Sequence, residues 1–116
     1  MHVSRPNRSW RLTLAGLPAV VVGGPLYIGR NPAALPPLDR AALLTIDDPA
    51  RSVSKTHALL DLEAGALWLT DLHSTNGSAV TDSAGLHTAL EPGIRTVVAA
   101  GSTIELGDFA IQVEHG

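Results

Sequence analysis

The sequence predicts an all-β fold, an eleven-stranded antiparallel β-sandwich, and three features of the chain support this prediction. Short apolar runs recur along the chain, and alternate residues in several of them are apolar, as expected for strands. Turn residues, chiefly glycine, proline and asparagine, separate the runs at short intervals. No stretch has a convincing helical pattern. Many short strands with frequent turn signals indicate two sheets packed face to face.

The first four strands are predicted from apolar runs with clear breaks between them. They lie at Trp10–Leu14, Ala19–Val22, Leu26–Ile28 and Leu44–Ile46. The turn signal Gly16-Leu17-Pro18 separates the first two, and Gly23-Gly24-Pro25 precedes the third. The next connection, 31–43, holds three prolines and is longer than most connections between strands. Long loops of this kind often carry function.

Seven further strands are predicted in the rest of the chain. They lie at Ala58–Leu62, Ala66–Thr70, Ser78–Val80, His87–Leu90, Thr96–Val98, Thr103–Leu106 and Phe109–Val113. The last two show the expected alternation, because Ile104 and Leu106 in one and Ile111 and Val113 in the other are separated by more polar residues. Gly107-Asp108 between them is typical of a tight turn.

Composition limits the classes of function. The chain has 116 residues, a length typical of one domain with an ordinary core. Without cysteine it forms no disulfide, thiolate zinc site or iron–sulfur cluster, and it is compatible with a reducing cytoplasm, where we expect it. Eight Lys and Arg against eleven Asp and Glu give a net charge of −3, and there is a single lysine. This balance argues against duplex nucleic acid as the main partner, so we expect any bound anion to be small and local.

An apolar stretch near the start, Leu12–Val22, imitates a signal peptide because Arg5, Arg8 and Arg11 precede it. A turn signal interrupts it, it is shorter than the roughly 20 apolar residues that span a membrane, and it lacks a small-residue cleavage site. We therefore interpret this stretch as a β-hairpin, and we expect no membrane association.

Polar residues gather in three predicted connections. If the loops after Ile28, Ile46 and Thr70 share one end of the sandwich, a set of side chains rich in hydrogen-bond donors and poor in acids converges there. This set comprises Arg30, Ser52, Ser54, Lys55, Ser74, Thr75 and Asn76.

The motifs in these connections resemble those of the forkhead-associated (FHA) domains. Gly29-Arg30 ends a predicted strand, Ser54–His57 has the pattern S-x-x-H, and Asp71–Gly77 has the pattern D-L-x-S-x-N-G. Further along, Leu90–Gly93 and Ile104–Gly107 are similar to the closing strands of that family. The resemblance spans about residues 11–114. It implies an SMAD/FHA-like sandwich with binding loops at one end, and a non-enzymatic module that binds phosphothreonine-containing proteins or peptides.

By resemblance, five residues bind the phosphopeptide: Arg30, Ser54, Lys55, Thr75 and Asn76. A guanidinium matches phosphate oxygens with a planar fork of donors and stays charged. The Ser54 hydroxyl would donate to the phosphate, and Lys55 would add a point charge where the family often has arginine. The amide of Asn76 would hold the peptide backbone, and Thr75 would reach the phosphate or the phosphothreonine main chain.

Three residues are expected to form the framework of the loops. Gly29 is interpreted as backbone that passes close to other loops, and Gly77 as a turn residue with positive φ. In the family the residue at the position of His57 holds the loops by hydrogen bonds. Ser54 and His57 could instead form the nucleophile and base of a hydrolase, but no third orienting group or G-x-S-x-G elbow is present. The histidines have no metal-ligand spacing, so we expect no metal site and no cofactor.

Several alternatives remain open from the residues alone. Arg30 could pair with Asp47 or Asp48 in a structural ion pair. The module could also be a degenerate scaffold that binds an unphosphorylated partner through a sandwich face. Whether Arg40 or Arg51 joins the site is undecided.

Preference at the third residue after the phosphothreonine is also open. Arg51 would favour an acidic residue there, whereas Leu72 or Val80 would favour an aliphatic one. We expect residues 1–116 to form one domain with a core at about 10–114, acting in threonine-kinase signalling or as part of a longer multidomain chain.

Overall fold

The computed structural model describes residues 9–38 and 40–116, which form eleven β-strands in two sheets. The strands are β1 (Trp10–Thr13), β2 (Val20–Val22), β3 (Leu26–Gly29), β4 (Ala42–Thr45), β5 (Ala58–Glu63), β6 (Ala66–Asp71), β7 (Ser78–Thr81), β8 (His87–Ala89), β9 (Thr96–Val98), β10 (Thr103–Leu106) and β11 (Phe109–His115). Every predicted strand is present, and its ends lie within two residues of those expected. The predicted β-sandwich is confirmed.

The two sheets have the strand orders β2-β1-β11-β10-β7-β8 and β4-β3-β5-β6-β9. All neighbouring strands run antiparallel except β3 and β4, which pair in parallel with Leu26 opposite Ala42 and Gly29 opposite Thr45. The expectation of an entirely antiparallel sandwich is therefore wrong at this one pair. A parallel pair needs a crossover of a dozen residues or more. The twelve residues between Gly29 and Ala42 supply that crossover, which explains why this proline-rich connection is so long.

The core lies between the sheets and is built from aliphatic side chains. Alternate residues of β10 and β11 point inward, so that Ile104, Leu106, Ile111 and Val113 are buried. Facing residues of the other sheet, such as Leu60, are buried in the same way. This apolar contact holds the two sheets together and fixes the strand ends from which the loops leave.

The apolar stretch at the start of the described chain is a β-hairpin, as predicted. β1 and β2 pair antiparallel, with Trp10 opposite Val22 and Leu12 opposite Val20. No helix in residues 9–38 and 40–116 is long and apolar enough to cross a membrane.

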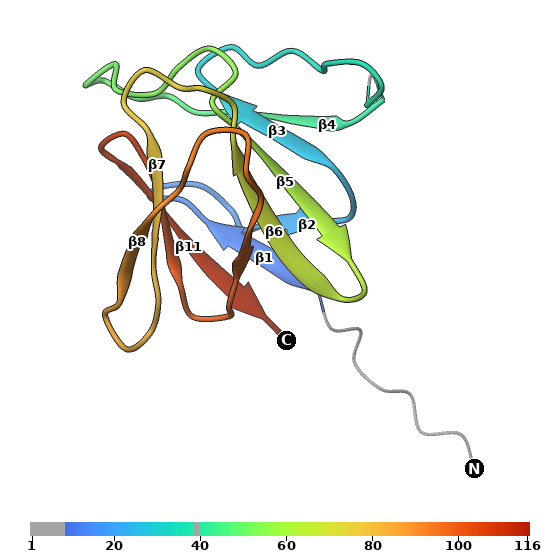
Figure 1. Ribbon diagram of the computed structural model, residues 1–116, viewed down its shortest axis with the longest axis vertical. Helices are drawn as coiled ribbons and strands as arrows, with labels where there is room; N and C mark the ends of the chain where they lie inside the picture. The colour runs from blue at the N-terminus through green and yellow to red at the C-terminus, as the bar shows by residue number, and fades with distance from the viewer. Residues whose placement is uncertain (1–8, 39) are drawn as a thin grey trace.

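The loops that follow β3, β4 and β6 lie together along the upper side of the molecule in Figure 1, and the β10–β11 turn lies near them. The opposite end of the view holds the β5–β6 and β7–β8 connections. The polar residues of the three long loops are thereby brought to one end of the sandwich.

Candidate functional site

Backbone hydrogen bonds join the three loops at this end. The amides of Arg30 and Asn31 donate to the carbonyls of Ser54 and Lys55, with N–O distances of 3.0 and 3.1 Å. The amide of Leu72 donates to the carbonyl of His57 at 2.9 Å. The loop that contains Ser54 is therefore the middle one and is held on both sides.

Gly29 permits the closest of these approaches. A Cβ atom built on Gly29 would lie 1.9 Å from the carbonyl oxygen of Lys55 and 3.0 Å from that of Ser54. Any other residue would force the two backbones apart. The interpretation of Gly29 as a point of close backbone approach agrees with this geometry, which places the adjacent Arg30 beside Ser54.

His57 lies at the centre of the loops and is completely buried. Its Nδ1 accepts a hydrogen bond from the backbone amide of Ser54 at 3.0 Å, and its Nε2 lies 2.8 Å from the carbonyl oxygen of Gly77. These partners select the neutral tautomer that carries its proton on Nε2. The imidazole thus connects the loop after β4 with the loop after β6. Gly77 adopts φ = +80°, which turns its carbonyl toward the ring and toward the amide of Gly107.

This arrangement does not place His57 as a base for the Ser54 hydroxyl. Nδ1 of His57 faces the amide of Ser54 rather than its hydroxyl, and Nε2 is committed to Gly77. Within the described part of the chain, no group of three or more His, Asp or Glu side chains is placed to hold a metal ion.

A hollow of about 130 Å³ opens between the loops. It is lined by Arg30, Arg51, Ser52, Val53, Ser54, Thr75 and Asn76. Four of the five predicted binding residues are thus brought together. Lys55 is exposed but does not line the hollow, whereas Arg51 does. Arg40 lies elsewhere, beside the start of β4.

The polar atoms around the hollow are held so that donors remain available. Nε of Arg30 lies 3.4 Å from the carbonyl of Val53, which orients the exposed guanidinium. Oγ of Ser54 accepts the amide hydrogen of Thr75 at 3.1 Å. The Ser54 hydroxyl hydrogen is therefore left to donate to a ligand. Among the acidic side chains that the structure describes, none forms an ion pair with Arg30, and Asp47 and Asp48 do not pair with it.

Asn76 joins the other side of the hollow to the middle loop. Its Nδ2 donates to the carbonyl of Ser52 at 2.9 Å. Its side-chain oxygen accepts no hydrogen bond from the described residues and belongs to an exposed residue. An extended ligand backbone could donate to this oxygen, which is the contact expected of Asn76 from the sequence.

Asp48 organises the loop that carries Arg51 and Ser54. Its carboxylate accepts hydrogen bonds from the amides of Ala50, Ser52 and Val53 and from the hydroxyl of Ser52. Burial raises the pKa of Asp48, but these hydrogen bonds outweigh it and hold the pKa below its usual value. This role of Asp48 was not predicted from the sequence. The Asp-Pro pair that precedes Ser52 is the signal that would have suggested a local turn of this kind.

Asp71 has the equivalent role in the loop after β6. It is buried, and its carboxylate accepts hydrogen bonds from the amide and hydroxyl of Ser74 and from the hydroxyl of Ser78. Burial raises the pKa of Asp71, yet the bonds from Ser74 and Ser78 together lower it below the usual value. Ser74, one of the polar side chains expected to converge on the site, is thus used to shape the loop that presents Thr75 and Asn76.

The hollow combines two guanidinium groups, a free hydroxyl hydrogen and the amide side chain of Asn76, and no carboxylate lines it. These groups are suited to an anion with several acceptor oxygens that arrives on an extended chain. The size of the hollow matches a small group such as a phosphate rather than a large cofactor.

Comparisons with known proteins agree with the fold. The sequence model of the FHA domain matches residues 26–107. A solved structure from a structural and functional analysis of phosphothreonine-dependent FHA domain interactions is 26% identical, with a TM-score of 0.65, covering 91% of this chain and 95% of that one. The FHA domain of human APLF in complex with an XRCC1 bisphospho peptide is 25% identical, with a TM-score of 0.69 and coverage of 91% and 97%.

A third similar structure, the FhaA FHA domain complexed with the intracellular domain of Rv3910, is 23% identical and has a TM-score of 0.66. The alignment covers 93% of this chain and all of that one, and it supports the fold. None of the curated protein sequences matches the chain at a significant level.

Proposed function

Because this chain belongs to the FHA domain family, we propose that it is a phosphothreonine-dependent protein-interaction module that binds its partner through the hollow between the loops. Phosphopeptide recognition is supported by the family and by a similar structure solved with a bisphospho peptide. The proposal is carried by the presence of both the Arg30 guanidinium and the Ser54 hydroxyl at one hollow that no carboxylate lines.

Selectivity for phosphothreonine over phosphoserine is proposed from the apolar part of the hollow. Val53 is the apolar residue among those that line the hollow, and its exposed fraction is 2%. A threonine methyl group placed against this small exposed part would lose contact with water, and serine has no methyl group to do so. One methyl group in an apolar site contributes about 1–3 kcal/mol.

Calorimetry with four matched peptides tests this proposal. The peptides carry phosphothreonine, phosphoserine, threonine or aspartate at one position. We expect the phosphothreonine peptide to bind most tightly and the threonine and aspartate peptides not to bind, because a phosphate brings about −1.5 to −2 charge and three acceptor oxygens. Comparable affinity for the aspartate peptide would refute phosphate recognition. Equal binding of phosphorylated and plain peptides would instead support a degenerate scaffold.

We further propose that Arg51 selects an acidic residue three positions after the phosphothreonine. Arg51 is exposed and lines the hollow, whereas Val80 is buried in β7 and Leu72 is half-buried. In a peptide library, acidic residues should be enriched at this position with the natural chain and lose that enrichment with Arg51→Ala. An unchanged preference for aliphatic residues would assign the selectivity to Leu72.

We also propose a biological setting from the requirement for phosphothreonine. A phosphothreonine ligand implies a kinase that phosphorylates threonine, so we place the module in the cytoplasm, in threonine-kinase signalling or in a longer multidomain chain. Fluorescence microscopy of the tagged protein tests the location. Recovery with the membrane fraction or outside the cell would contradict it.

A further inference from the structure

We propose that the free edge of β4 binds, as an added strand, a segment of the same phosphoprotein whose phosphothreonine occupies the hollow, and that a groove at the far end of β4 anchors this segment. The inference rests on the proposed function and extends it from one phosphorylated residue to a longer stretch of the partner. Its basis is the position of β4 between two separate concave sites.

The edge of β4 is open to a partner. β4 is the terminal strand of its sheet and pairs only with β3. The amides of Ala42 and Ile46 donate to the carbonyls of Pro25 and Gly29, so the even-numbered residues direct their backbone groups toward β3. Backbone groups alternate in direction along a strand, and those of Leu43 and Thr45 therefore point outward.

Natural edges are commonly protected by charge, proline or bulges. β4 has the sequence Ala-Leu-Leu-Thr, which contains none of these, and Leu43 is 51% exposed. In the described chain, the backbone groups of Leu43 and Thr45 form no hydrogen bond with a turn or loop. An extended chain can add to such an edge by main-chain hydrogen bonds.

The two ends of β4 lie beside different sites. In the parallel pair, Thr45 lies opposite Gly29, which directly precedes Arg30 at the hollow. Ala42 lies opposite Leu26 at the other end. Both Ala42 and Leu26 line a groove of about 440 Å³. The three-residue step from Leu26 to Gly29 corresponds to about 10 Å. A strand on the outer edge of β4 would therefore reach the groove about four to six residues from the phosphothreonine.

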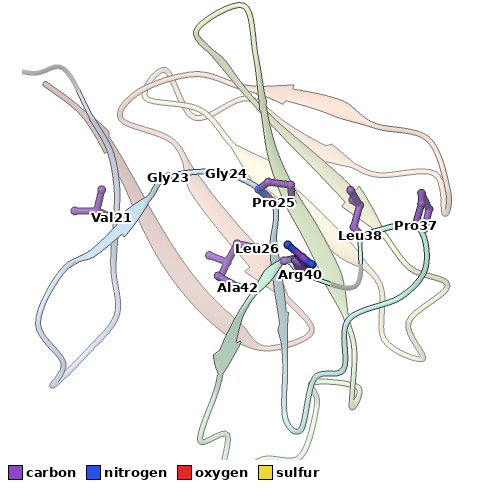
Figure 2. A pocket seen from close by; sticks show the side chains of 10 residues that line it. Val21, Gly23, Gly24, Pro25, Leu26, Pro37, Leu38, Arg40 and Ala42 are labelled. Carbon is purple, nitrogen blue, oxygen red and sulfur yellow. The ribbon is translucent and has the colours of Figure 1, made fainter.

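The chemistry of the groove indicates what its occupant carries. Figure 2 shows Leu26 and Ala42 at the middle of the groove, Val21 on one side, and Leu38 and Arg40 on the other. Most lining side chains are apolar, and Arg40 is exposed. No acidic side chain in the described residues pairs with Arg40. The matching segment has an apolar side chain for the groove and a neighbouring carboxylate for the guanidinium.

Peptides of two lengths test the proposal by calorimetry. The short probe is a phosphothreonine peptide that fills only the hollow. The long probes add about six residues of alternating valine and threonine that end in leucine and glutamate, on the amino side in one peptide and on the carboxyl side in another. We expect one long probe to bind roughly tenfold more tightly or better, because it adds backbone hydrogen bonds and one buried side chain.

Variants of the chain locate the gain. Leu43→Lys should abolish it, because charge on an edge opposes strand addition, and Arg40→Glu should reduce it. Val97→Lys is the matched control, since Val97 is 55% exposed and lies on β9 at the other edge of the same sheet. It should leave the gain unchanged. N-methylation of those amides in the extension that face β4 should abolish the gain in affinity. N-methylation of the amides between them, which face away from β4, should preserve it.

The outcomes separate the inference from the proposed function. Tight binding of the short probe with no gain for either long probe would overturn the added strand and leave phosphopeptide binding intact. A gain that survives Leu43→Lys would also overturn it. Failure of all phosphopeptides to bind would overturn both, because the added strand depends on a bound phosphothreonine.

Discussion

At Arg30, backbone and side chain have separate roles, because the amide holds the middle loop while the guanidinium faces the hollow. Arg30→Ala should therefore remove a charge-assisted contact of roughly 1.5–3 kcal/mol and weaken the short phosphopeptide about tenfold to over a hundredfold. Calorimetry measures the affinity, and the melting temperature should hardly change. Arg40→Ala is the control on an exposed arginine outside the hollow, and a matching loss there would contradict the assignment.

Other side chains around the hollow should show smaller effects. Ser54→Ala and Asn76→Ala each remove one neutral hydrogen-bonding group from the hollow, and a neutral hydrogen bond contributes about 0.5–1.5 kcal/mol. Lys55→Ala should have the least effect on affinity, since Lys55 is exposed and does not line the hollow. If Lys55→Ala weakened binding as much as Arg30→Ala, the boundary of the site would need revision.

His57 should affect stability before it affects binding. His57→Ala leaves the amide of Ser54 without its buried partner and removes one of the two hydrogen bonds to the carbonyl of Gly77, which still accepts the amide of Gly107. A buried group left unpaired costs about 1–3 kcal/mol, so the melting temperature should fall by several degrees or more. Differential scanning calorimetry measures this change. His87→Ala, at an exposed position on β8, should melt almost normally, and equal melting of the two variants would disprove the framework role.

At the scale of elements, the end of β3 depends on Gly29. Gly29→Ala places a methyl group where the carbonyl oxygen of Lys55 lies, so the loops after β3 and β4 must separate. We expect both the melting temperature and the phosphopeptide affinity to fall. Gly24→Ala is the matched control, because nothing lies within 4 Å of a Cβ atom at Gly24. Normal melting and binding of Gly29→Ala would show that the close approach is dispensable.

The loop between β6 and β7 should make stability depend on pH. The pKa of Asp71 is lowered in the folded chain, so its contribution is complete above the unfolded value of about 4 and is lost as the pH falls toward the folded pKa. The melting temperature of Asp71→Asn should therefore decline less steeply than that of the natural chain below about pH 4. Asp48, whose pKa is also lowered, contributes in the same range and leaves a residual slope. A variant curve parallel to the natural one would refute the role of Asp71.

For the whole molecule, charge distinguishes this module from a nucleic-acid binder. The net charge is −3, and the cations at the hollow are Arg30 and Arg51. Phosphopeptide affinity should therefore fall gently with salt, whereas duplex binders with 6–10 phosphate contacts lose about 10³–10⁵ between 50 and 200 mM. Calorimetry at several salt concentrations measures the slope. Random duplex DNA should not compete, and a gel shift of such DNA that disappears in Arg30→Ala would contradict the assigned partner.

The strands could be predicted from the amino-acid sequence, because alternating apolar residues and turn signals act over a few neighbouring positions. The hairpin at Leu12–Val22 was predictable for the same reason. The spacing of Arg30, Ser54 and Asn76 was recognisable by its resemblance to FHA domains, since motifs keep their order along the chain.

How the strands and loops contact one another became clear only from the three-dimensional fold. The parallel pairing of β3 with β4, the inclusion of Arg51 in the hollow and the exclusion of Lys55 depend on contacts between residues far apart in the sequence. The role of Asp48 became clear only when its hydrogen bonds to the loop were known. The alternation of apolar and polar residues predicts which face of a sheet a residue occupies, but not which strand lies beside it. The open edge of β4 and the groove at its end could therefore be found only from the packing of the two sheets.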